Sequence, residues 1–506
     1  MELLYYFLPT LFILLIVKLL VQTKKNLPPS PFAIPILGHL HLFKLPLNRT
    51  LQALTNQYGP ILFLRFGSRP VLVISSQSLA EECFTKNDII FANRPHTITG
   101  DRLSYNYTIF TWSSYGHHWR NMRRITTIEI FSSKSLQMSY AIRKEEIHCL
   151  VKNLYQSSNC GLQHFDLKFQ FSKLMFNTVM RMVAGKRFFE DFMDLDEQKQ
   201  VHVHLKAIFA PFMFLNMEDF LPIIKWIGLN GRENNMIKVQ KKRDSFLQDM
   251  INEYRQKINS SSTSVAEEKN KTTIIGALLS IQEAEPEYYS DEIIKGIILS
   301  MFTAGTDTTT LTMEWAMSLL LNHPNILHKA LSEIDSQVQG RLLDDSDLAK
   351  LPYLHCIINE TLRLYPAAPL LLPHISSEEC TVGGYSIPRG TILLANAWAI
   401  QRDPNMWVEP KTFMPERFEG VQGEKEMGFK FLPFGVGRRG CPGAALAMRV
   451  VALALGTFIQ CFEWERVGGD QVDMNENNTG VTMPKANPLI ATCKPRPGVV
   501  SALSQI

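Results

Sequence analysis

The sequence predicts a mainly α-helical chain with small β-sheets, an α+β fold, preceded by one N-terminal transmembrane helix. Three observations lead to this expectation. Apolar residues recur at helical spacing through most of residues 79–281 and again over residues 291–321. Short β-type stretches bounded by glycine and proline occur within residues 61–74 and 382–395. The first apolar run, residues 3–21, has about the length that crosses a bilayer core, roughly 20 residues.

The composition is that of a globular protein and excludes some classes of function. The chain has 506 residues, of which 45% are hydrophobic and 20% charged, with a formal net charge of +4. Such a small excess of positive charge, without a concentrated basic patch, argues against nucleic acid as a partner. The eight cysteines are scattered without pairable spacing, so a secreted disulfide framework is not expected and reducing surroundings are favoured.

Residues 1–22 are expected to form a retained membrane anchor. Lys18 lies near the end of the apolar run, where its side chain can reach the interface. A cleaved signal peptide is the alternative, but the segment has neither a basic n-region nor a cleavage site of small residues. Lys24 and Lys25 follow directly, and the positive-inside rule then places the rest of the chain in the cytosol.

The segment after the anchor, residues 23–38, is rich in proline and is expected to be a stiff hinge, because each proline restricts the preceding residue and removes a donor. The chain is long enough for several domains. It shows no internal repeat and no clear linker after residue 35, so residues 39–506 are expected to form one domain. Residues 61–66 and 71–74 predict a hairpin near its start, and the polar run 259–273 predicts a surface loop.

A single cysteine stands in a glycine-rich stretch, Phe434 to Gly443, directly before the apolar helical run 444–462. The glycines allow sharp turns that bring N–H groups towards sulfur, and the helix after Cys441 adds the positive end of its dipole, so the thiolate is favoured. A closed zinc site is excluded because no CxxC or HxxxH partner lies nearby. Two interpretations remain open at this point: an ordinary buried cysteine, or the axial ligand of a haem iron.

The middle of the long helical pattern 291–321 is chemically unusual. It contains Ala304-Gly305-Thr306-Asp307-Thr308-Thr309, in which glycine costs up to about 1 kcal/mol relative to alanine and the polar side chains compete for backbone hydrogen bonds. A locally opened helix with a carboxylate and hydroxyls can hold ordered water and pass protons. The alternative is a polar patch on an amphipathic helix, which the apolar flanking residues disfavour.

Two further helices carry paired polar side chains. Glu360 and Arg363, in a predicted helix over 352–364, are one turn apart, although an exposed pair of this kind is common and contributes only about 0.3–0.5 kcal/mol. Trp119 and Arg123 are likewise one turn apart, so an indole N–H and a guanidinium share a helix face and suit a carboxylate. The alternative for this second helix is an amphipathic helix with a basic face.

These motifs resemble those of the haem-thiolate monooxygenases, the cytochrome P450 family. Phe434, Gly437, Arg439, Cys441 and Gly443 match the family's haem-binding signature at every defined position. The stretch 304–309 resembles its oxygen-activation motif, and Glu360-x-x-Arg363 followed by Pro415-Glu416-Arg417-Phe418 resembles its ion pair with an arginine partner. The motifs occur in the family's order, and with the anchor and hinge the resemblance covers essentially the whole chain. It is closest to the plant microsomal branch, in the group with isoflavone hydroxylases and lignan methylenedioxy-bridge-forming enzymes.

The resemblance implies the cytochrome P450 fold and a haem b whose iron takes the Cys441 thiolate as axial ligand. It further implies that Asp307 and Thr308 manage protons during oxygen activation, and that Glu360, Arg363 and Arg417 form a buried structural ion-pair network. The implied cofactor-binding residues are Trp119, Arg123, Ala304, Gly305, His374, Pro433, Phe434, Arg439, Cys441 and Gly443. The implied substrate-pocket residues, assigned by where the family's recognition segments fall, are Phe110, Phe209, Phe214, Phe302, Leu370 and Thr482.

The implied reaction inserts one oxygen atom of O₂ into an apolar plant metabolite such as an isoflavonoid, lignan or terpenoid, by hydroxylation or oxidative bridging. Electrons are expected from NADPH through a membrane-bound flavoprotein reductase at the endoplasmic reticulum, docked on the cysteine side near Arg120, Arg438 and Arg449. One alternative is an O₂-independent haem-thiolate isomerase or dehydratase, which would have little use for Asp307 and Thr308. Another is a non-catalytic haem protein, which would need no path for substrate.

Overall fold

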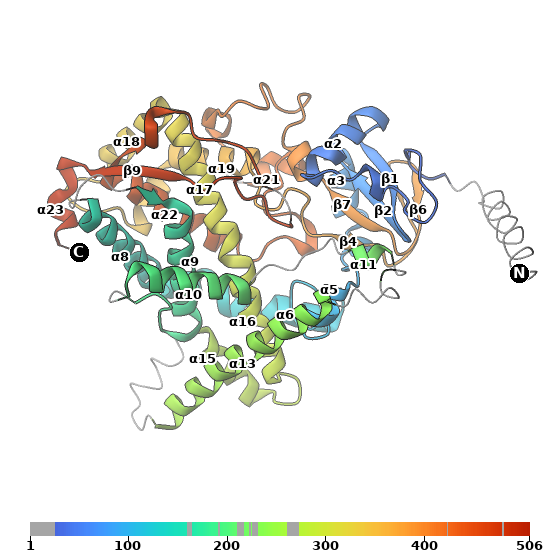
Figure 1. Ribbon diagram of the computed structural model, residues 1–506, viewed down its shortest axis with the longest axis horizontal. Coiled ribbons are helices and arrows are strands. Elements are labelled where there is room, and N and C mark those ends of the chain that lie inside the picture. The colour runs from blue at the N-terminus through green and yellow to red at the C-terminus, as the bar shows by residue number, and fades with distance from the viewer. Residues whose placement is uncertain are drawn as a thin grey trace, which may run out of the picture.

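The computed structural model describes residues 26–158, 164–190, 193–209, 217–221, 224, 231–260, 273–421, 424–477 and 480–505. Within these ranges the chain is mainly helical with three small sheets (Figure 1), which confirms the fold class predicted from the sequence. The predicted transmembrane helix over residues 1–22, the pocket candidate Phe214 and most of the predicted loop 259–273 lie outside the described residues.

Helices form most of the structure. In chain order the α-helices are α2 (Leu47–Tyr58), α3 (Gln77–Phe84), α4 (Asp88–Phe91), α5 (Ile98–Leu103), α6 (His117–Ile125), α7 (Ser133–Met138), α8 (Tyr140–Ser158), α9 (Leu167–Ala184), α10 (Leu195–Ile208), α11 (Met217–Phe220), α13 (Gly231–Ser260), α15 (Ile274–Ala284), α16 (Asp291–Gly305), α17 (Asp307–Asn322), α18 (Pro324–Gln337), α19 (Pro352–Leu364), α20 (Ala397–Ile400), α21 (Glu424–Met427), α22 (Ala444–Cys461) and α23 (Val500–Leu503). The apolar helical run after the cysteine and the helix over 352–364 are therefore found as predicted, in α22 and α19.

The strands are short and form sheets of four, three and two strands. They are β1 (Ile61–Phe66), β2 (Arg69–Ile74), β3 (Phe165–Asp166), β4 (His374–Ile375), β5 (Cys380–Val382), β6 (Tyr385–Ile387), β7 (Ile392–Ala395), β8 (Phe462–Arg466) and β9 (Ile490–Pro495). The predicted hairpin is β1–β2, with Ile61 opposite Ile74. In the largest sheet β7 runs parallel to β2 and antiparallel to β4, which joins segments about 300 residues apart and places His374 beside the N-terminal part of the chain.

Helices α16 and α17 run through the middle of the molecule (Figure 1). They form one nearly continuous rod that is interrupted at Thr306, where φ is −84° and ψ is −58°. The interruption falls inside the stretch 304–309, where the sequence predicted a locally opened helix. Helices α17 and α22 are buried over most of their length and, with α19, contribute to the largest apolar core. This core holds the two motif-bearing segments, α16–α17 and the start of α22, in fixed relation.

The Trp315 side chain fastens a C-terminal loop to α17. Its ring stacks on Tyr365 with centroids 3.9 Å apart, and its Nε1 donates to the Met483 carbonyl at 2.9 Å. The main-chain N–H of Leu489 donates to Glu314 of the same helix at 3.0 Å. Residues 480–489 are therefore held against α17, which positions Thr482 next to the helix interruption.

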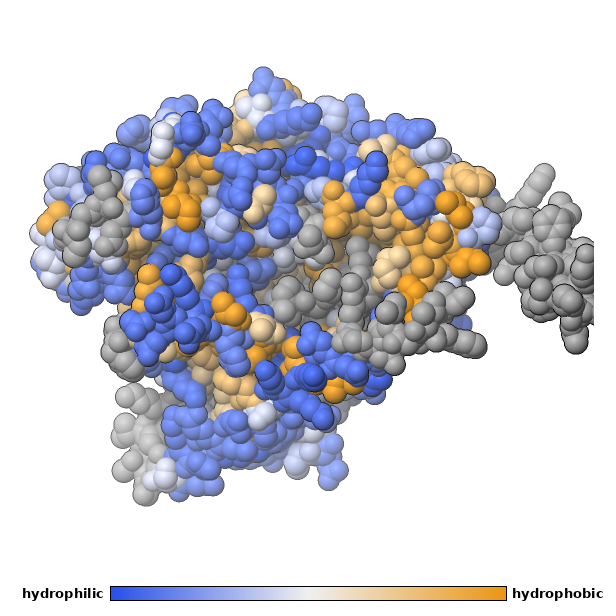
Figure 2. All heavy atoms as spheres, in the orientation of Figure 1, coloured by the Kyte–Doolittle hydropathy of each residue, from blue (hydrophilic) through white to orange (hydrophobic). Residues whose placement is uncertain are grey.

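The described part of the predicted hinge is bonded to the body of the protein. The Phe63 N–H donates to the Pro29 carbonyl at 2.9 Å, and Ile34 and Gly38 bridge each other in a tight turn. Several apolar side chains around this turn are exposed, with exposed fractions of 80% for Phe32, 77% for Ile36 and 63% for Leu45. Figure 2 shows hydrophobic side chains gathered on this side of the molecule, near the N-terminus.

Among the described residues, one helix is long and apolar enough to cross a membrane by length and composition, namely α22. It is 67% buried inside the protein, so its apolar character is explained by its place in the core.

Candidate functional site

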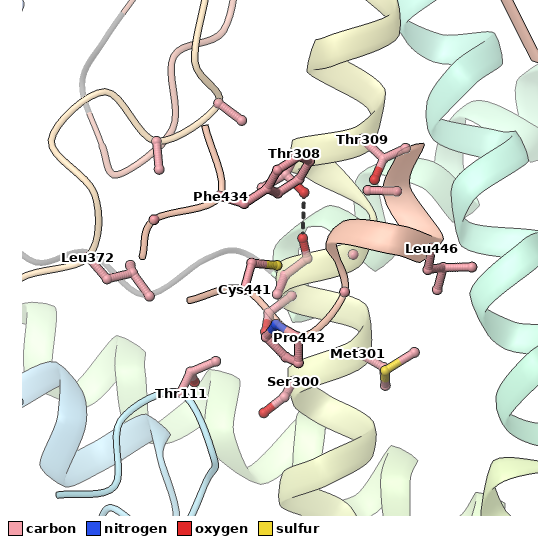
Figure 3. Close-up of a pocket in the computed structure, with 18 of the residues that line it drawn as sticks. Thr111, Ser300, Met301, Thr308, Thr309, Leu372, Phe434, Cys441, Pro442 and Leu446 are labelled. Atoms are coloured by element: carbon pink, nitrogen blue, oxygen red, sulfur yellow. Dashed lines mark hydrogen bonds between the residues drawn. The ribbon is translucent and has the colours of Figure 1, made fainter. Parts of the chain in front are cut away.

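A cavity of about 320 Å³ lies between the α16–α17 rod and the cysteine loop, residues 434–443. Its wall is mainly apolar and includes Phe110, Ile297, Met301, Leu371, Leu372 and Val481. Most of the residues that the sequence assigned to a cofactor share this wall: Trp119, Ala304, Gly305, His374, Pro433, Phe434, Arg439, Cys441 and Gly443. Figure 3 shows Cys441 on the side of its loop that faces the helix carrying Ser300 and Thr308.

The cysteine loop is folded back on itself by backbone hydrogen bonds. The Cys441 N–H donates to the Phe434 carbonyl at 2.9 Å, and the Gly440 N–H donates to Gly437 at 3.1 Å. Helix α22 begins at Ala444, so the positive end of its dipole lies next to Cys441, as the sequence suggested. This geometry presents one sulfur at the cavity wall.

Gly437 allows the loop to approach α3 and α4 closely. Its φ is +71°, and a Cβ there would lie 2.5 Å from Asp88 Oδ1 and 3.1 Å from the Phe84 carbonyl oxygen. The same aspartate pairs with Arg438, whose Nε is 3.1 Å from Asp88 Oδ2. A larger residue at 437 would therefore push the cysteine loop away from the helices that support it.

We expect Gly437→Ala to destabilise the loop more than Gly420→Ala. Gly420 also has a positive φ, +78°, but a Cβ there would meet no atom within 4 Å, so it controls for backbone strain alone. The loss of unfolding free energy in Gly437→Ala should exceed that in Gly420→Ala by about 1–3 kcal/mol, the usual range for overpacking. Thermal unfolding of both variants measures the difference, and equal unfolding temperatures would show that the close approach to Asp88 is unimportant.

Trp119 and Arg123, both on α6, make different contacts. Trp119 is 4% exposed, lines the cavity, and its indole N–H has no hydrogen-bond partner among the described residues. Arg123 is not among the residues that line the cavity, and its expected role beside Trp119 stays a prediction. Its Nη1 donates to the Gly440 carbonyl at 2.8 Å, and burial lowers the pKa of its guanidinium while Cys441 acts in the opposite direction. Arg123 thus holds the cysteine loop, and Trp119 offers a free donor to the cavity.

Three basic side chains meet at one corner of the cavity: Arg94, His374 and Arg439. Arg94 Nη1 donates to the Pro373 carbonyl at 2.7 Å, Arg439 Nε to Ala92 at 2.7 Å, and His374 Nδ1 to Phe91 at 2.7 Å. In the described part of the chain neither arginine forms an ion pair with a carboxylate. This corner therefore concentrates positive charge, which is supported by backbone carbonyls and, for Arg439, by the Trp119 ring, whose centroid lies 4.7 Å from the guanidinium carbon.

Burial shifts the pKa values in this basic corner downwards. It lowers the pKa of Arg94 to about 9, and burial together with repulsion from Arg94 and Arg123 lowers the pKa of Arg439 to about 8. Burial and Arg94 also hold the pKa of His374 well below its usual value. Charges that are costly to bury persist where an anion offsets them, so the corner suits one or two carboxylates.

Arg94 was missed by the sequence analysis. The local sequence Asn93-Arg94-Pro95 predicts only a break between helices. Its importance comes from a long-range bridge between Asn93 and Ile375, in which the Ile375 N–H donates to the Asn93 carbonyl at 3.1 Å. No local signal predicts this pairing.

The interruption of the α16–α17 rod opens onto the cavity. Ala304, Gly305 and Thr308 line the wall, and Thr308 Oγ1 donates to the Ala304 carbonyl at 2.6 Å (dashed line in Figure 3). Asp307 does not line the wall. Its Oδ2 accepts from Thr482 Oγ1 at 3.2 Å, and Thr482 itself is a wall residue. The structure therefore links Asp307 to the cavity through the Thr482 hydroxyl.

Lys206 of α10 lies close enough to Asp307 to interact with it. Burial lowers the pKa of the Lys206 ammonium, and Asp307 is the largest influence in the opposite direction. Asp307 thus lies between a partly buried cation and the hydroxyl of a wall residue, so its carboxylate is connected to the cavity without lining it.

Glu360 and Arg363 of α19 form a fully buried pair. Arg363 Nε and Nη2 donate to the two carboxylate oxygens at 2.6 and 2.8 Å, and Arg417 Nε reaches Glu360 Oε1 at 3.2 Å. Arg363 also donates to the carbonyl of Gln401 at 2.8 Å, while the Leu432 N–H donates to the Gln401 side chain at 2.7 Å. The pair therefore connects α19 to the segment that leads into the cysteine loop.

The predicted substrate-pocket residues are divided. Phe110 and Thr482 lie on the wall, whereas Phe209, Phe302 and Leu370 do not. Phe209, directly after α10, and Phe302 of α16 stack on each other with centroids 4.4 Å apart and are both buried in the core. In the segment containing Leu370, its neighbours Leu371 and Leu372 face the cavity instead.

The residues at the cavity fit the cofactor that the sequence implied. One cysteine sulfur faces apolar walls, and the basic corner with the unpartnered Trp119 N–H provides donors for two carboxylates. A haem b needs an axial ligand, an apolar environment for its ring and partners for its two propionates. Each requirement has a matching group among the described residues.

Comparison with known proteins agrees with this fit. Residues 28–491 match the family model described as Cytochrome P450. The chain is 51% identical over 498 residues to cytochrome P450 81Q32 of Catharanthus roseus, which covers 98% of this chain and 97% of that protein. It is 45% identical over 494 residues to isoflavone 2'-hydroxylase of Medicago truncatula, covering 96% of each. It is also 46% identical over 485 residues to (+)-piperitol/(+)-sesamin synthase CYP81Q2 of Sesamum radiatum, covering 95% and 93%.

Proposed function

Because the chain belongs to the cytochrome P450 family, in its plant CYP81 branch, and is therefore a monooxygenase, we propose that it oxidises an apolar plant specialised metabolite. The observation that carries the proposal is the cavity beside Cys441, whose walls are apolar except at the basic corner and at a few hydroxyls. The substrate is an isoflavonoid, lignan or terpenoid. Isoflavonoids and lignans are favoured because one relative at 45% identity is named isoflavone 2'-hydroxylase and another at 46% is named (+)-piperitol/(+)-sesamin synthase.

The protein's own groups hold the cofactor in this proposal. The Cys441 thiolate binds the iron, Trp119 and the basic corner bind the propionates, and Arg123 fixes the loop that carries the thiolate. When bound, the haem supplies the site at which O₂ is activated and one oxygen atom is inserted into the substrate, with NADPH-derived electrons. The apolar walls exclude water and orient the substrate.

Proton supply is assigned to Asp307, Thr482 and Thr308. Thr482 Oγ1 donates to Asp307 Oδ2 at 3.2 Å, so Thr482 can pass its hydroxyl proton into the cavity and regain one from the Asp307 carboxyl group once that group has taken up a proton. The Thr308 hydroxyl donates to the Ala304 carbonyl, which fixes its oxygen at the helix interruption as an acceptor facing the cavity. These groups can pass protons to the part of the cavity beside Thr308 without opening the cavity to bulk water.

We expect Thr308→Ala to uncouple the reaction. NADPH is then still oxidised, but its electrons reduce O₂ to hydrogen peroxide. Product formed per NADPH falls about 10-fold or more, since positioned proton transfer typically contributes about 10²–10⁴ in rate. Thr310→Ala is the matched control, because Thr310 makes the same bond to the carbonyl one turn earlier, at 2.8 Å, but is absent from the wall. Measuring NADPH, peroxide and product together tests the role, which fully coupled turnover of Thr308→Ala would refute.

The electron donor in this proposal is a flavoprotein reductase at the endoplasmic reticulum membrane. Two of the three arginines expected at its docking surface are engaged within the protein: Arg438 with Asp88 at 3.1 Å and Arg449 with Asp345 at 3.3 Å. Arg120 forms no ion pair with the described residues and lies over the Tyr115 ring at 5.8 Å. Among these three arginines, Arg120 is therefore the main source of positive charge for attracting the reductase.

Membrane attachment is assigned to residues 1–22, and the exposed Phe32, Ile36 and Leu45 support it. They lie where the described chain begins, so a membrane anchored there would cover them and offset the cost of exposing large apolar side chains. The active cavity then receives apolar substrates close to the lipid phase.

Turnover of a defined panel tests the proposed function. The full-length protein with the reductase and NADPH should convert at least one isoflavonoid, lignan or terpenoid, and the product should carry one oxygen atom from ¹⁸O₂ or a new methylenedioxy bridge. Conversion without NADPH or O₂ would indicate an isomerase or dehydratase. Absence of both binding and conversion across the panel would refute the substrate class.

A further inference from the structure

Two hydroxyl groups, those of Ser300 and Thr111, lie in a mainly apolar part of the cavity wall. Ser300 lies on α16, and Thr111 lies on the loop between α5 and α6. The same cavity is lined by apolar side chains, including those of Phe110 and Ile297. In Figure 3 the Ser300 side chain points to the side of α16 on which the loop carrying Thr111 lies.

The loop that carries Thr111 is packed directly on α16. A Cβ on Gly296 would lie 3.1 Å from the Ile109 side chain, and Gly296 is one helical turn before Ser300 on the same face. Because Ile109 is two residues before Thr111, this contact places Thr111 and Ser300 on adjoining walls of one corner.

Two sets of hydrogen bonds fix the loop in this position. His118 joins the Thr108 carbonyl to the Tyr288 hydroxyl, with both hydrogen bonds 2.7 Å long, and Tyr288 lies just before α16. Arg94 Nε donates to the Thr111 carbonyl at 3.2 Å. The Thr111 side chain is therefore presented by a rigid backbone, which lowers the entropy cost of binding a ligand there.

The two hydroxyls have different hydrogen-bonding capacity. Ser300 Oγ donates to the Gly296 carbonyl at 2.9 Å, so its proton is engaged and only its lone pairs remain for a ligand. The Thr111 hydroxyl has no hydrogen-bond partner among the described residues, so it can both donate and accept. A ligand hydroxyl matches this pair, because it can donate to Ser300 and accept from Thr111, whereas a methyl ether can only accept.

We propose that Ser300 and Thr111 form a subsite for a phenolic or alcoholic hydroxyl of the substrate. This deepens the proposed function and rests on it. Ser300 precedes Ala304 by one turn on the same helix face, a rise of about 6 Å, so the subsite holds the hydroxyl end of the substrate away from the wall beside Thr308. The subsite thereby selects substrates that carry a free hydroxyl. It directs oxidation to a part of the substrate that lies farther from this hydroxyl.

Binding titrations of the haem-loaded full-length protein, followed by the substrate-induced spectral shift, test the subsite. One series comprises a monohydroxyisoflavone, its methyl ether and the deoxy compound. A second comprises 4-phenylphenol, 4-methoxybiphenyl and biphenyl, which probes the subsite whatever the natural substrate is. The variants are Ser300→Ala and Thr111→Val. The control is Ser280→Ala, because Ser280 of α15 makes the same bond to a glycine carbonyl one turn earlier, at 3.1 Å, on an exposed surface.

We expect Ser300→Ala to weaken binding of the hydroxylated ligands about 5- to 10-fold, the effect of losing one hydrogen bond in an apolar site. Binding of the ethers and deoxy compounds should stay within about 2-fold. Thr111→Val should weaken both hydroxylated and methoxylated ligands, because both accept from Thr111, and Ser280→Ala should change nothing.

Two results separate the inference from the proposed function. Equal effects of Ser300→Ala on all members of both series, or no effect on any, would overturn the subsite while isoflavone binding still supported the proposed substrate class. Absence of isoflavone binding combined with a Ser300-dependent preference for 4-phenylphenol would support the subsite and overturn an isoflavonoid as substrate.

Discussion

Replacing Cys441 with serine is expected to abolish both the thiolate spectrum and catalysis. A serine hydroxyl does not ionise near neutral pH, so it cannot replace the anionic sulfur that favours oxygen activation. The red-shifted Soret band of the reduced carbonyl complex should disappear. Product formation should fall at least about 100-fold, which corresponds to about 2.7 kcal/mol in the activation free energy.

Cys380→Ser is the matched control for this experiment. Cys380 lies on β5, is partly exposed and is absent from the cavity wall, so its replacement should leave the band and the activity unchanged. A red-shifted band that survives in Cys441→Ser but is lost in Cys380→Ser would contradict the ligand assignment. Far-ultraviolet circular dichroism of both variants shows whether the fold is retained.

Removing Glu360 should have the largest effect on stability. In Glu360→Ala the guanidinium of Arg363, which is fully buried, loses its carboxylate partner. Breaking a buried pair in this way typically costs about 3–5 kcal/mol, a large part of the roughly 5–15 kcal/mol by which proteins are stable. We expect a strongly reduced yield of folded protein and a markedly lower unfolding temperature.

An exposed pair in the same protein provides the comparison. Lys494 Nζ lies 3.3 Å from Glu465 Oε1, with side chains 57% and 55% exposed, and Glu465→Ala should cost less than about 1 kcal/mol. The double variant Glu360→Leu, Arg363→Met removes the charges of the closest pair and should recover part of the lost stability, although Arg417 then loses its carboxylate and carbonyls such as that of Gln401 lose their donor. Similar unfolding temperatures for Glu360→Ala and Glu465→Ala would show that burial does not strengthen the pair.

Features encoded within a few neighbouring residues could be predicted from the sequence. The hairpin β1–β2, helices α19 and α22, and the interruption near Thr306 follow from spacing, proline and glycine positions, and helix propensity. The positions of Cys441 and Thr308 at the cavity follow from the same local patterns, because a short motif fixes both the turn and the side chain that it presents.

Features that depend on contacts between distant segments could not be predicted. Arg94 joins the basic corner through a bridge to Ile375, and Thr111 meets α16 through the close contact of Ile109 with Gly296. The hydrogen bonds that join Asp307 to Thr482 and Arg123 to Gly440 also connect distant segments, and the sequence did not indicate them. Periodicity gives the face of a helix and leaves its partner undetermined.

The basic corner has a consequence for how much enzyme a cell contains. Arg94 is buried and Arg439 is half-buried, each with backbone carbonyls as partners, and such charges reduce the stability of the chain until an anion offsets them. A dianionic cofactor that binds only the folded state stabilises that state by mass action. The abundance of the protein should therefore follow the supply of haem, because chains made in excess of it are less stable and are degraded first.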